Sequence, residues 1–334
     1  MSLPTPETGS TGGGEFALIA RHFQRPNATY PAQVSLGIGD DCALLQPTPG
    51  HRMAISTDML VQGRHFFPDV DPGALGHKAL AVNLSDLAAM GAHPLGFTLA
   101  LALPDANDAW LARFAQGLFA LADAEGCPLV GGDTTRGPLN ICITVFGEVA
   151  PDRALRRDAA QAGDDLWISG RTGEARLALA LRQNEAWAQG TLGAVQDRMD
   201  RPIPRLGLGR ALSAIPGVHA ALDVSDGLVG DLQHILDASR VGAEIQVARL
   251  PVAPALQALE APARLECLLA GGDDYELLFT ASTTARADIE AASQRTGTAC
   301  TRIGLITPPD GLRLIDAQGN TVQAALRGFD HFAT

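Results

Sequence analysis

Aspartates that lie beside glycine, serine or threonine recur along the whole sequence. In the first group, two glycines allow a sharp turn and two carboxylates follow at once. The groups are Gly37-Ile38-Gly39-Asp40-Asp41, Ser56-Thr57-Asp58, Asn83-Leu84-Ser85-Asp86, Gly131-Gly132-Asp133-Thr134-Thr135, Asp223-Val224-Ser225-Asp226-Gly227 and Gly271-Gly272-Asp273-Asp274. Because hard divalent cations prefer carboxylate and hydroxyl oxygens, we expect the fold to gather most of these groups around metal ions and a polyphosphate.

Such a cluster of carboxylates would require cations. Two unit charges about 4 Å apart repel by about 4 kcal/mol at an effective dielectric constant of about 20. Several such pairs would exceed the stability of a whole domain, which is roughly 5–15 kcal/mol. The cluster must therefore take up protons or bind cations, and Mg²⁺ held by a few carboxylates and substrate phosphates is the natural choice. Lys78, Arg136 and Arg157 are candidates to neutralise the remaining phosphate charge.

The familiar nucleotide-binding motifs are absent from the sequence. It contains no GxxxxGK[ST] phosphate loop, no GxGxxG helix start and no HRD or DFG kinase motif. A nucleotide would therefore bind by a different design, in which carboxylates hold metals and the metals hold phosphates. The acidic groups also do not fit the spacing of an EF-hand loop, which counts against a structural protein that only binds divalent cations.

Each acidic group, taken singly, has an ordinary structural explanation. A Gly-Asp-Asp run is usually a solvated turn, and Ser-Thr-Asp after a strand is commonly a helix cap. Asp86 within a helix is most often a residue of the polar face. His65 beside Phe66 and Phe67 is more often packed than functional, and Phe329 is a core residue by default. The recurrence of one pattern, rather than any single instance, favours a metal and phosphate site.

The composition is that of an acidic globular protein. The 334 residues are 46% hydrophobic and 19% charged, which is enough to build two cores. A net charge of −12 argues against nucleic acid or an anionic membrane as a partner. The five cysteines form no CxxC pair and no apolar run approaches the about 20 residues of a membrane span, so we expect a cytoplasmic protein. Lys78 is the only lysine, and every other basic residue except histidine is arginine. The base composition of the coding DNA explains most of this preference for arginine. The functional alternative is that Lys78 places a compact point charge on a phosphate.

Alternating helix and strand patterns must position the acidic groups. Polar, arginine-rich residues 150–158 mark the expected domain boundary, and residues 1–14 are expected to form a flexible tail. Lys78 and Asp86 fall eight positions apart on one helix, so they can share a broad face but not one line. Helices are expected at 15–24, 74–90, 108–125, 174–182, 196–199, 206–214, 228–239, 265–270 and 285–295. Strands are expected at 52–56, ending at Thr57-Asp58, and at 96–103, 128–130, 140–148, 165–169, 220–222, 275–280 and 300–306.

Together these motifs resemble the thiamine-monophosphate kinase family of the PurM-like ATP-binding superfamily. The resemblance runs from about residue 14 to the C-terminus, and it implies an α/β (α+β) fold with two domains. A ferredoxin-like N-terminal domain at 15–150 would bind ATP and Mg²⁺ and form a homodimer, in which two sheets pair into a barrel. An α/β domain would span 151–334. The matching motifs are Gly-Glu-Phe at 14–16, LGIGDDCA at 36–43, Ser-Thr-Asp at 56–58, KALAVNLSDLAAMG at 78–91, GGDTTRGP at 131–138, DVSDGL at 223–228 and GGDDYEL at 271–277.

The resemblance implies ATP- and Mg²⁺-dependent phosphorylation of thiamine monophosphate to thiamine diphosphate. The implied metal ligands are Asp41, Ser56 or Thr57, Asp58, Asp86, Asp133, Asp223 and Asp226, with Asp40 as a further candidate. The implied nucleotide contacts are Gly132, Asp133, Arg157 and Ser225, and the implied contacts to thiamine monophosphate are His65, Asp273 and Phe329. The family commonly has glutamate at the position of Asp273, and tyrosine or tryptophan at that of Phe329. No residue is assigned as a catalytic base, because the acceptor phosphate is already ionised.

Two other functions remain open at this point. One is an ATP-dependent ligase or synthetase of the same superfamily, although the residues at 56–60 and 83–86 favour the kinase. The other is a divalent-cation-binding structural protein without enzymatic activity.

Overall fold

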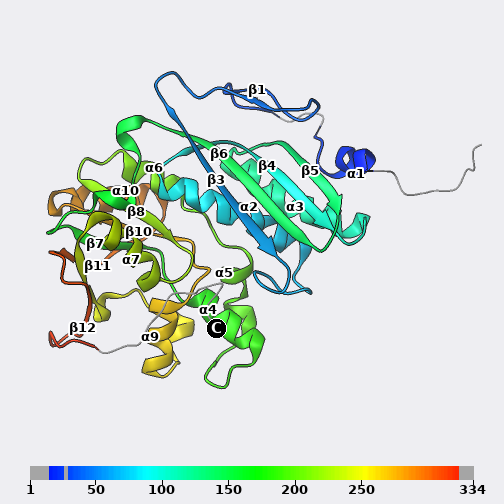
Figure 1. The fold of residues 1–334 in the computed structure, drawn as a ribbon. Coiled ribbons are helices and arrows are strands. Elements are labelled where there is room, and N and C mark those ends of the chain that lie inside the picture. The colour runs from blue at the N-terminus through cyan, green and yellow to red at the C-terminus, as the bar shows by residue number, and fades with distance from the viewer. Residues whose placement is uncertain (1–14, 26–28, 323–334) are drawn as a thin grey trace, which may run out of the picture.

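The structure, a computed structural model, describes residues 15–25 and 29–322. Two main β-sheets form, one of four strands within residues 52–149 and one of six strands within residues 165–315 (Figure 1). A short hairpin of β1 (Val34–Leu36) and β2 (Leu44–Leu45) precedes them, and its turn carries Asp40 and Asp41. The mixture of helices and strands confirms the predicted α/β class.

Within the described residues, helices cover one face of the four-stranded sheet and leave the other face open. Its strands are β3 (Arg52–Val61), β6 (Asn140–Val149), β4 (His93–Leu103) and β5 (Leu129–Arg136), in that spatial order, with only β4 and β5 parallel. Helices α2 (Pro72–Ala89) and α3 (Asp108–Glu125) cover one face, where Leu99, Leu101 and Ile143 are buried. On the opposite face, Ile55 and Met59 of the edge strand β3 are 61% and 53% exposed.

Strands β3 and β5 are longer than the sequence pattern predicts. β3 was expected to end at Thr57-Asp58, but it pairs with β6 without interruption from Arg52 to Val61. β5 likewise continues through Asp133 to Arg136 in parallel pairing with β4. The pairing with β6 and β4 continues past Asp58 and Asp133, so the acidic residues do not end these strands. Asp58 and Asp133 therefore lie within strands, where neighbouring side chains point to opposite faces.

The six-stranded sheet is covered on both faces. Its order is β12 (Leu312–Ile315), β9 (Gly242–Gln246), β11 (Cys300–Thr307), β7 (Asp165–Ser169), β10 (Glu276–Ala281) and β8 (Val218–Val224), and all neighbours are antiparallel except β12 and β9. Helices α4 (Glu174–Gln183), α7 (Leu228–Ser239) and α9 (Ala261–Ala270) pack on one face. Helices α6 (Leu206–Ser213) and α10 (Arg286–Thr296) pack on the other. The sequence pattern missed β1, β2, β9 and β12.

Helix α2 lies between the two sheets and contacts both (Figure 1). Asp71 caps its first turn by accepting a hydrogen bond from the Ala74 N–H at 2.8 Å, and the left-handed Gly91 follows its end. Buried residues make up 14 of its 18 positions, as expected for a helix enclosed on all sides. Side chains of α2 therefore reach the region where the two halves of the chain meet.

One apolar core runs through that region. A single cluster of buried side chains includes α2, α3 and the four-stranded sheet, and it continues to Trp167, Leu277 and Phe279 of the six-stranded sheet. The two sheets fall on either side of residue 150, but the division into domains at 15–150 and 151–334 stays a prediction. The remaining helices are α1 (Glu15–His22), α5 (Gln196–Asp200) and α8 (Pro254–Gln257). None of the helices in the described ranges is long and apolar enough to cross a bilayer.

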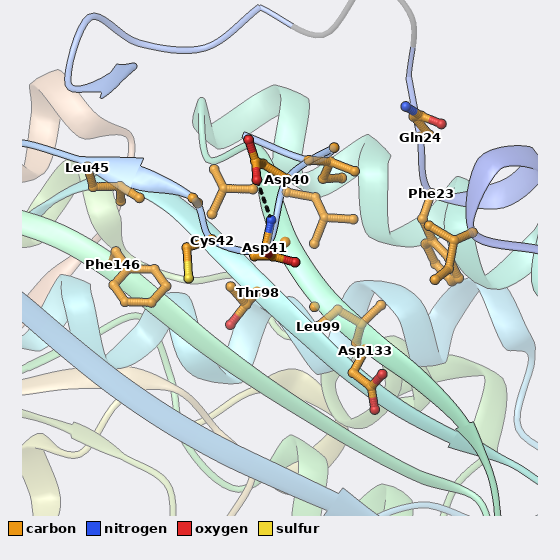
Figure 2. A pocket seen from close by; sticks show the side chains of 18 of the residues that line it. Phe23, Gln24, Asp40, Asp41, Cys42, Leu45, Thr98, Leu99, Asp133 and Phe146 are labelled. Atoms are coloured by element: carbon orange, nitrogen blue, oxygen red, sulfur yellow. Dashed lines mark hydrogen bonds between the residues drawn. The ribbon is translucent and has the colours of Figure 1, made fainter. Parts of the chain in front are cut away.

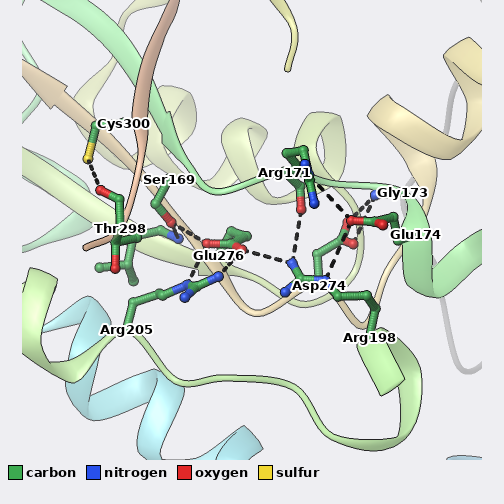
Figure 3. Close-up of polar contacts among 11 residues, drawn as sticks. Ser169, Arg171, Gly173, Glu174, Arg198, Arg205, Asp274, Glu276, Thr298 and Cys300 are labelled. Carbon is green, nitrogen blue, oxygen red and sulfur yellow. Dashed lines mark hydrogen bonds and ion pairs between the residues drawn. The ribbon is translucent and has the colours of Figure 1, made fainter. Parts of the chain in front are cut away.

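A buried ion-pair network fixes the start of β10 (Figure 3). Glu276 is fully buried, and its carboxylate accepts hydrogen bonds from Ser169 Oγ at 2.5 Å and Arg198 Nη2 at 2.9 Å. Arg205 donates to both of its oxygens, at 2.8 and 2.5 Å. A buried carboxylate is tolerated only when it is paired in this way. The network ties β7 and β10 to α5 and to the segment between α5 and α6.

Candidate active site

Carboxylates from both halves of the chain line one cavity of about 620 Å³, here called the acidic cavity. Asp58 comes from β3, Asp86 from α2 and Asp223 from the C-terminal part of β8. Ser225, Asp226 and Asp273 join them from the loops that follow β8 and precede β10. The structure thus brings together acidic groups that are up to 215 positions apart, counted from Asp58 to Asp273.

Burial and mutual repulsion perturb the three central carboxylates. Burial, followed by the charges of Asp86 and Asp226, raises the pKa of Asp58 to about 6. Burial and the charge of Asp86 raise the pKa of Asp223 to about 7. Burial also raises the pKa of Asp86, although a hydrogen bond from Ser56 and the charge of Arg157 oppose that rise. Carboxylates held in this way are stabilised by protons or by cations, as the sequence pattern predicted.

Hydrogen bonds fix β3 against α2 at these carboxylates. Ser56 Oγ donates to Asp86 Oδ2 at 2.5 Å, which joins the two elements directly. The Oδ1 atom of Asn83 accepts the backbone N–H of Asp58 at 2.9 Å, while its amide group donates to the Ala79 carbonyl at 3.0 Å. The positions of Asp58 and Asp86 are therefore set by the fold before any ligand binds.

Asp231 supports the loop after β8 and was not singled out from the sequence. Its carboxylate accepts the backbone N–H groups of Ser225 and Asp226, both at 3.0 Å. It is 5% exposed, and burial raises its pKa to about 7. An acidic residue in the first turn of the helix after Asp226-Gly227 is the sequence signal that could have identified it.

The loop that carries Asp273 has an unusual backbone. Asp273 and Tyr275 have φ angles of 65° and 51°, which side-chain-bearing residues seldom adopt. The N–H groups of these two residues donate to the carbonyls of Ser225 and Val224, each at 2.8 Å. Asp274 does not line the acidic cavity, and its carboxylate accepts the Gly173 N–H at the start of α4 (Figure 3). The two loops are thus bound to each other.

Lys78 does not take the phosphate position considered for it. Its side chain is 4% exposed, and its Nζ donates to Asp273 Oδ2 at 2.9 Å. The side chain is therefore a buried partner of a cavity residue, and it is not among the residues that line the acidic cavity. The position of Lys78 therefore does not support the alternative of a point charge on a phosphate.

A second cavity adjoins the first and contains arginines. This arginine cavity, of about 470 Å³, is lined by Ser56, Arg156 and Arg157 among other residues. Asp86 and Asp223 line it as well, so these two carboxylates border both cavities. Arg157 is placed by a 3₁₀ turn whose Arg157 carbonyl accepts a hydrogen bond from Ser239 of α7 at 2.7 Å. The two cavities therefore meet at Asp86 and Asp223.

Asp41 and Asp133 lie elsewhere, in a cavity of about 1080 Å³ on the open face of the four-stranded sheet (Figure 2). Gly132 and Asp40 line it too, and Asp40 Oδ1 accepts the Asp41 N–H at 2.8 Å. Asp133 of β5 pairs in register with Ala100 of β4, and the same register continues across β6 to Met59 of β3. The side chains of these residues project from the sheet face opposite α2.

The expectation of one shared pocket is therefore wrong within a single chain. β3 and β5 are the two edges of the sheet, so three strand spacings, about 15 Å, separate Asp58 from Asp133. The two side chains also leave the sheet on opposite faces. Sequence reasoning had taken both aspartates as loop residues at strand ends, where such a separation would not arise. That Asp41 and Asp133 bind metal stays a prediction.

The carboxylates do not form a preassembled metal cage. Among the described residues, no three or more histidine, cysteine, aspartate or glutamate side chains lie close enough to hold one metal ion. Mg²⁺ does not require such a cage, because it is usually bound through one or two carboxylates together with waters and substrate phosphates. The raised pKa values of Asp58 and Asp223 and the all-oxygen donor set fit that kind of site.

The remaining residues that the sequence analysis singled out do not all lie in the acidic cavity. His65 lines the acidic cavity, where its Nδ1 accepts the Val61 N–H at 2.9 Å. Thr57 points to the open face and pairs with Thr144 at 2.8 Å, so Ser56 rather than Thr57 is directed toward Asp86. Arg136 is exposed at the end of β5 and lines none of these three cavities. Phe329 lies outside the described residues.

Comparison with known proteins identifies the relatives of this chain. Profiles of the AIR synthase related protein N-terminal and C-terminal domains match residues 39–149 and 161–317. The chain is 46% identical to the thiamine-monophosphate kinase of Escherichia coli strain K12, over 96% of this chain and 99% of that protein.

Solved structures agree with the sequence comparison. A crystal structure of thiamine-monophosphate kinase from Stenotrophomonas maltophilia K279a superposes with a TM-score of 0.80 at 44% identity, covering 90% of this chain and 94% of that chain. AaThiL complexed with AMPPCP and TMP superposes with a TM-score of 0.72 at 28% identity, covering 86% of this chain and 89% of that chain. The predicted PurM-like fold is thereby confirmed.

Proposed function

The chain belongs to the thiamine-monophosphate kinase family, and on that basis we propose that it transfers the γ-phosphoryl group of ATP to thiamine monophosphate. The products would be ADP and thiamine diphosphate. The observation that carries this proposal is that two cavities meet at Asp86 and Asp223. The relatives' shared name and the neighbour complexed with AMPPCP, an ATP analogue, and TMP support both substrates.

The arrangement suggests where each substrate binds. The arginine cavity contains Arg157, whose positive charge suits the phosphates of ATP. The acidic cavity contains His65 and Asp273, which are the predicted contacts for thiamine monophosphate. In this arrangement the donor and acceptor phosphates approach each other at Asp86 and Asp223. Of the other predicted nucleotide contacts, Ser225 lines the acidic cavity, and Gly132 and Asp133 line the cavity on the open sheet face.

Asp58, Asp86 and Asp223 are the residues that would hold Mg²⁺, with Ser56 and Asp226 beside them. When bound, Mg²⁺ neutralises phosphate charge and aligns the reacting groups. The protein's own contribution is to position both substrates, through the Ser56 and Asn83 hydrogen bonds that fix the carboxylates and through the charge of Arg157. Because the acceptor phosphate is already ionised, we propose direct in-line transfer without a general base or a phosphoenzyme.

We also propose that the protein is a cytoplasmic homodimer. Ile55, Met59 and Val61 of β3 are 61%, 53% and 37% exposed on the open face of the four-stranded sheet. An apolar sheet face of this kind requires a cover, and a second copy of the same face would supply one. Asp41 and Asp133 are on that face, so any metal or nucleotide that they bind would lie at the interface.

A product assay tests the proposed reaction. The protein is incubated with ATP, Mg²⁺ and thiamine monophosphate, and thiamine diphosphate is quantified by chromatography. Omission of thiamine monophosphate and chelation of Mg²⁺ serve as controls, and both should abolish product formation. ATP turnover without thiamine diphosphate would favour a synthetase of the same superfamily, and cation binding without ATP turnover would favour a structural protein. A phosphorylated protein on the productive path would contradict direct transfer.

A further inference from the structure

The pairing of Lys78 with Asp273 is not explained by the proposed reaction alone. Lys78 is the chain's only lysine, and it extends from α2 to a loop 195 positions away in the other half of the chain. The Lys78 side chain is 4% exposed, whereas the Asp273 side chain is 38% exposed and lines the acidic cavity. A buried cation therefore supports a carboxylate that a ligand can reach.

The Asp273 carboxylate is held from two directions. Lys78 Nζ donates to Oδ2 at 2.9 Å, and the Tyr275 hydroxyl donates to Oδ1 at 3.1 Å. Tyr275 is 8% exposed, and burial raises the pKa of its hydroxyl, which therefore remains a donor. Each carboxylate oxygen has a second lone pair. The carboxylate is thus fixed in direction while it can still accept a hydrogen bond from a ligand.

The backbone under this carboxylate is strained. Asp273 and Tyr275 both have positive φ angles, and such residues persist only where the surrounding structure enforces them. Here the N–H groups of Asp273 and Tyr275 are bound to the loop after β8. Gly272 has no room for a side chain, because a Cβ there would overlap the Ser225 carbonyl. Strain of this kind indicates that the direction of Asp273 is specified.

We propose that Lys78 is a positioning residue for the acceptor substrate: it holds Asp273 so that its carboxylate contacts the ring part of thiamine monophosphate. This inference rests on the proposed function. A carboxylate would repel the acceptor's phosphate, whereas the rings of thiamine carry a cationic thiazolium and an amino group that can donate a hydrogen bond. Asp273 therefore suits the rings, and the carboxylates Asp86 and Asp223 with their cations suit the phosphate.

The identity of the lysine follows from the same geometry. An ammonium group is compact and can direct one of its donors at a single carboxylate oxygen. A guanidinium group is larger and has five donors, several of which would find no acceptor at a site that is 4% exposed. We therefore expect that Lys78→Arg, like Lys78→Met, raises the KM for thiamine monophosphate.

A double-mutant cycle tests the positioning role. Lys78→Met, Asp273→Asn and the double variant are compared by steady-state kinetics and by calorimetric titration of thiamine monophosphate without ATP. Each single change should raise the KM and the dissociation constant for thiamine monophosphate by about ten-fold or more, because a hydrogen bond to a charged group is lost. The KM for ATP should stay within about two-fold. The double variant should bind no more weakly than the weaker single variant. It also guards against misfolding, because removal of both charges leaves no unpaired ion.

A neighbouring residue provides the matched control. His77 also lies on α2 and also contacts the second half of the chain, where its Nε2 bonds to the Pro202 carbonyl at 2.8 Å. His77→Asn should lower the melting temperature while the KM for thiamine monophosphate is unchanged. Equal KM increases in the His77 and Lys78 variants, additive effects in the cycle, or an unchanged KM in Lys78→Met would each overturn the positioning role. A wild-type protein that forms no thiamine diphosphate would instead overturn the proposed function.

Discussion

At the scale of single residues, the buried carboxylates make folding stability depend on pH. Asp223 has a pKa of about 7 in the folded protein, above its ordinary value, because of burial and the charge of Asp86. Between these two pKa values the folded state binds more protons than the unfolded state. Stability therefore falls as pH rises through this range, since unfolding is then accompanied by proton release.

This sign gives a prediction for the metal-free protein. Asp223→Asn removes the titrating group. The melting temperature of this variant minus that of the wild type should therefore increase between pH 5 and pH 8. The measurement is thermal unfolding of both proteins in a chelator across this range. A constant difference at all pH values would show that Asp223 titrates normally. Added Mg²⁺ should then stabilise the wild type at pH 8 more than the variant.

Asp86 and Asp223 also allow a direct test of the shared carboxylates. Asp86→Asn and Asp223→Asn should each reduce kcat by at least about a hundred-fold, because a neutral amide cannot hold the cation that neutralises phosphate charge. Circular dichroism should show that both variants fold. Asp237→Asn, at an exposed position of α7, is the matched control and should keep full activity. Near-normal turnover in either test variant would remove that residue from the proposed metal site.

At the scale of elements, the close crossing of α2 and α3 positions the site. A Cβ on Gly117 of α3 would overlap the Gly73 carbonyl of α2, and one on Gly76 would overlap the Phe114 carbonyl. The two helices can therefore approach closely only because glycine occupies these positions. Asp86 and Lys78 are on α2, so a shift of this helix would move both.

Gly117→Ala should therefore destabilise the protein by about 1–3 kcal/mol, the usual cost of overpacking, and should also lower kcat. Chemical denaturation and the product assay measure the two effects. Gly207→Ala is the control, because this exposed glycine of α6 has room for a methyl group. It should be neutral or should stabilise the protein by up to about 1 kcal/mol. Equal stability of the Gly117 variant and the wild type would contradict the close-crossing argument.

The sequence predicted elements well where local signals were strong. The bounds of α3 agree with the expected 108–125, because the side chain of Asn107 caps its start and a left-handed Gly126 ends it. The ends of β3 and β5 were not predicted, since strand length there depends on pairing with β6 and β4 rather than on local composition. β9 and β12 were missed for the same reason: they are short and are defined by partners distant in the sequence.

The candidate site was predictable in part. The recurrent aspartates pointed to Asp58, Asp86, Asp223 and Asp226, and the structure places these around one cavity. The sequence could not show on which face of a strand Asp133 projects, because that depends on sheet register. It also gave no hint that Lys78 is bound to Asp273, a contact that exists only after the two halves pack together.

At the scale of the whole molecule, the open sheet face predicts self-association. Ile55→Lys introduces a charge at a side chain that is 61% exposed in one chain and would be buried between two. Sedimentation velocity should show a dimer for the wild type and a monomer for this variant. Ile203→Lys is the control, because Ile203 is 52% exposed and lies outside that sheet. A monomeric wild type would contradict the homodimer.

The account depends on the acids of both halves forming one site for metal and phosphate. The most direct test is a crystal structure with Mn²⁺ in place of Mg²⁺, AMPPCP and thiamine monophosphate, in which anomalous scattering locates the metal. The account predicts anomalous peaks that place Mn²⁺ ions within coordination distance of Asp86 and Asp223, between the phosphates of the two ligands. Both ligands bound with no metal at these carboxylates would contradict it.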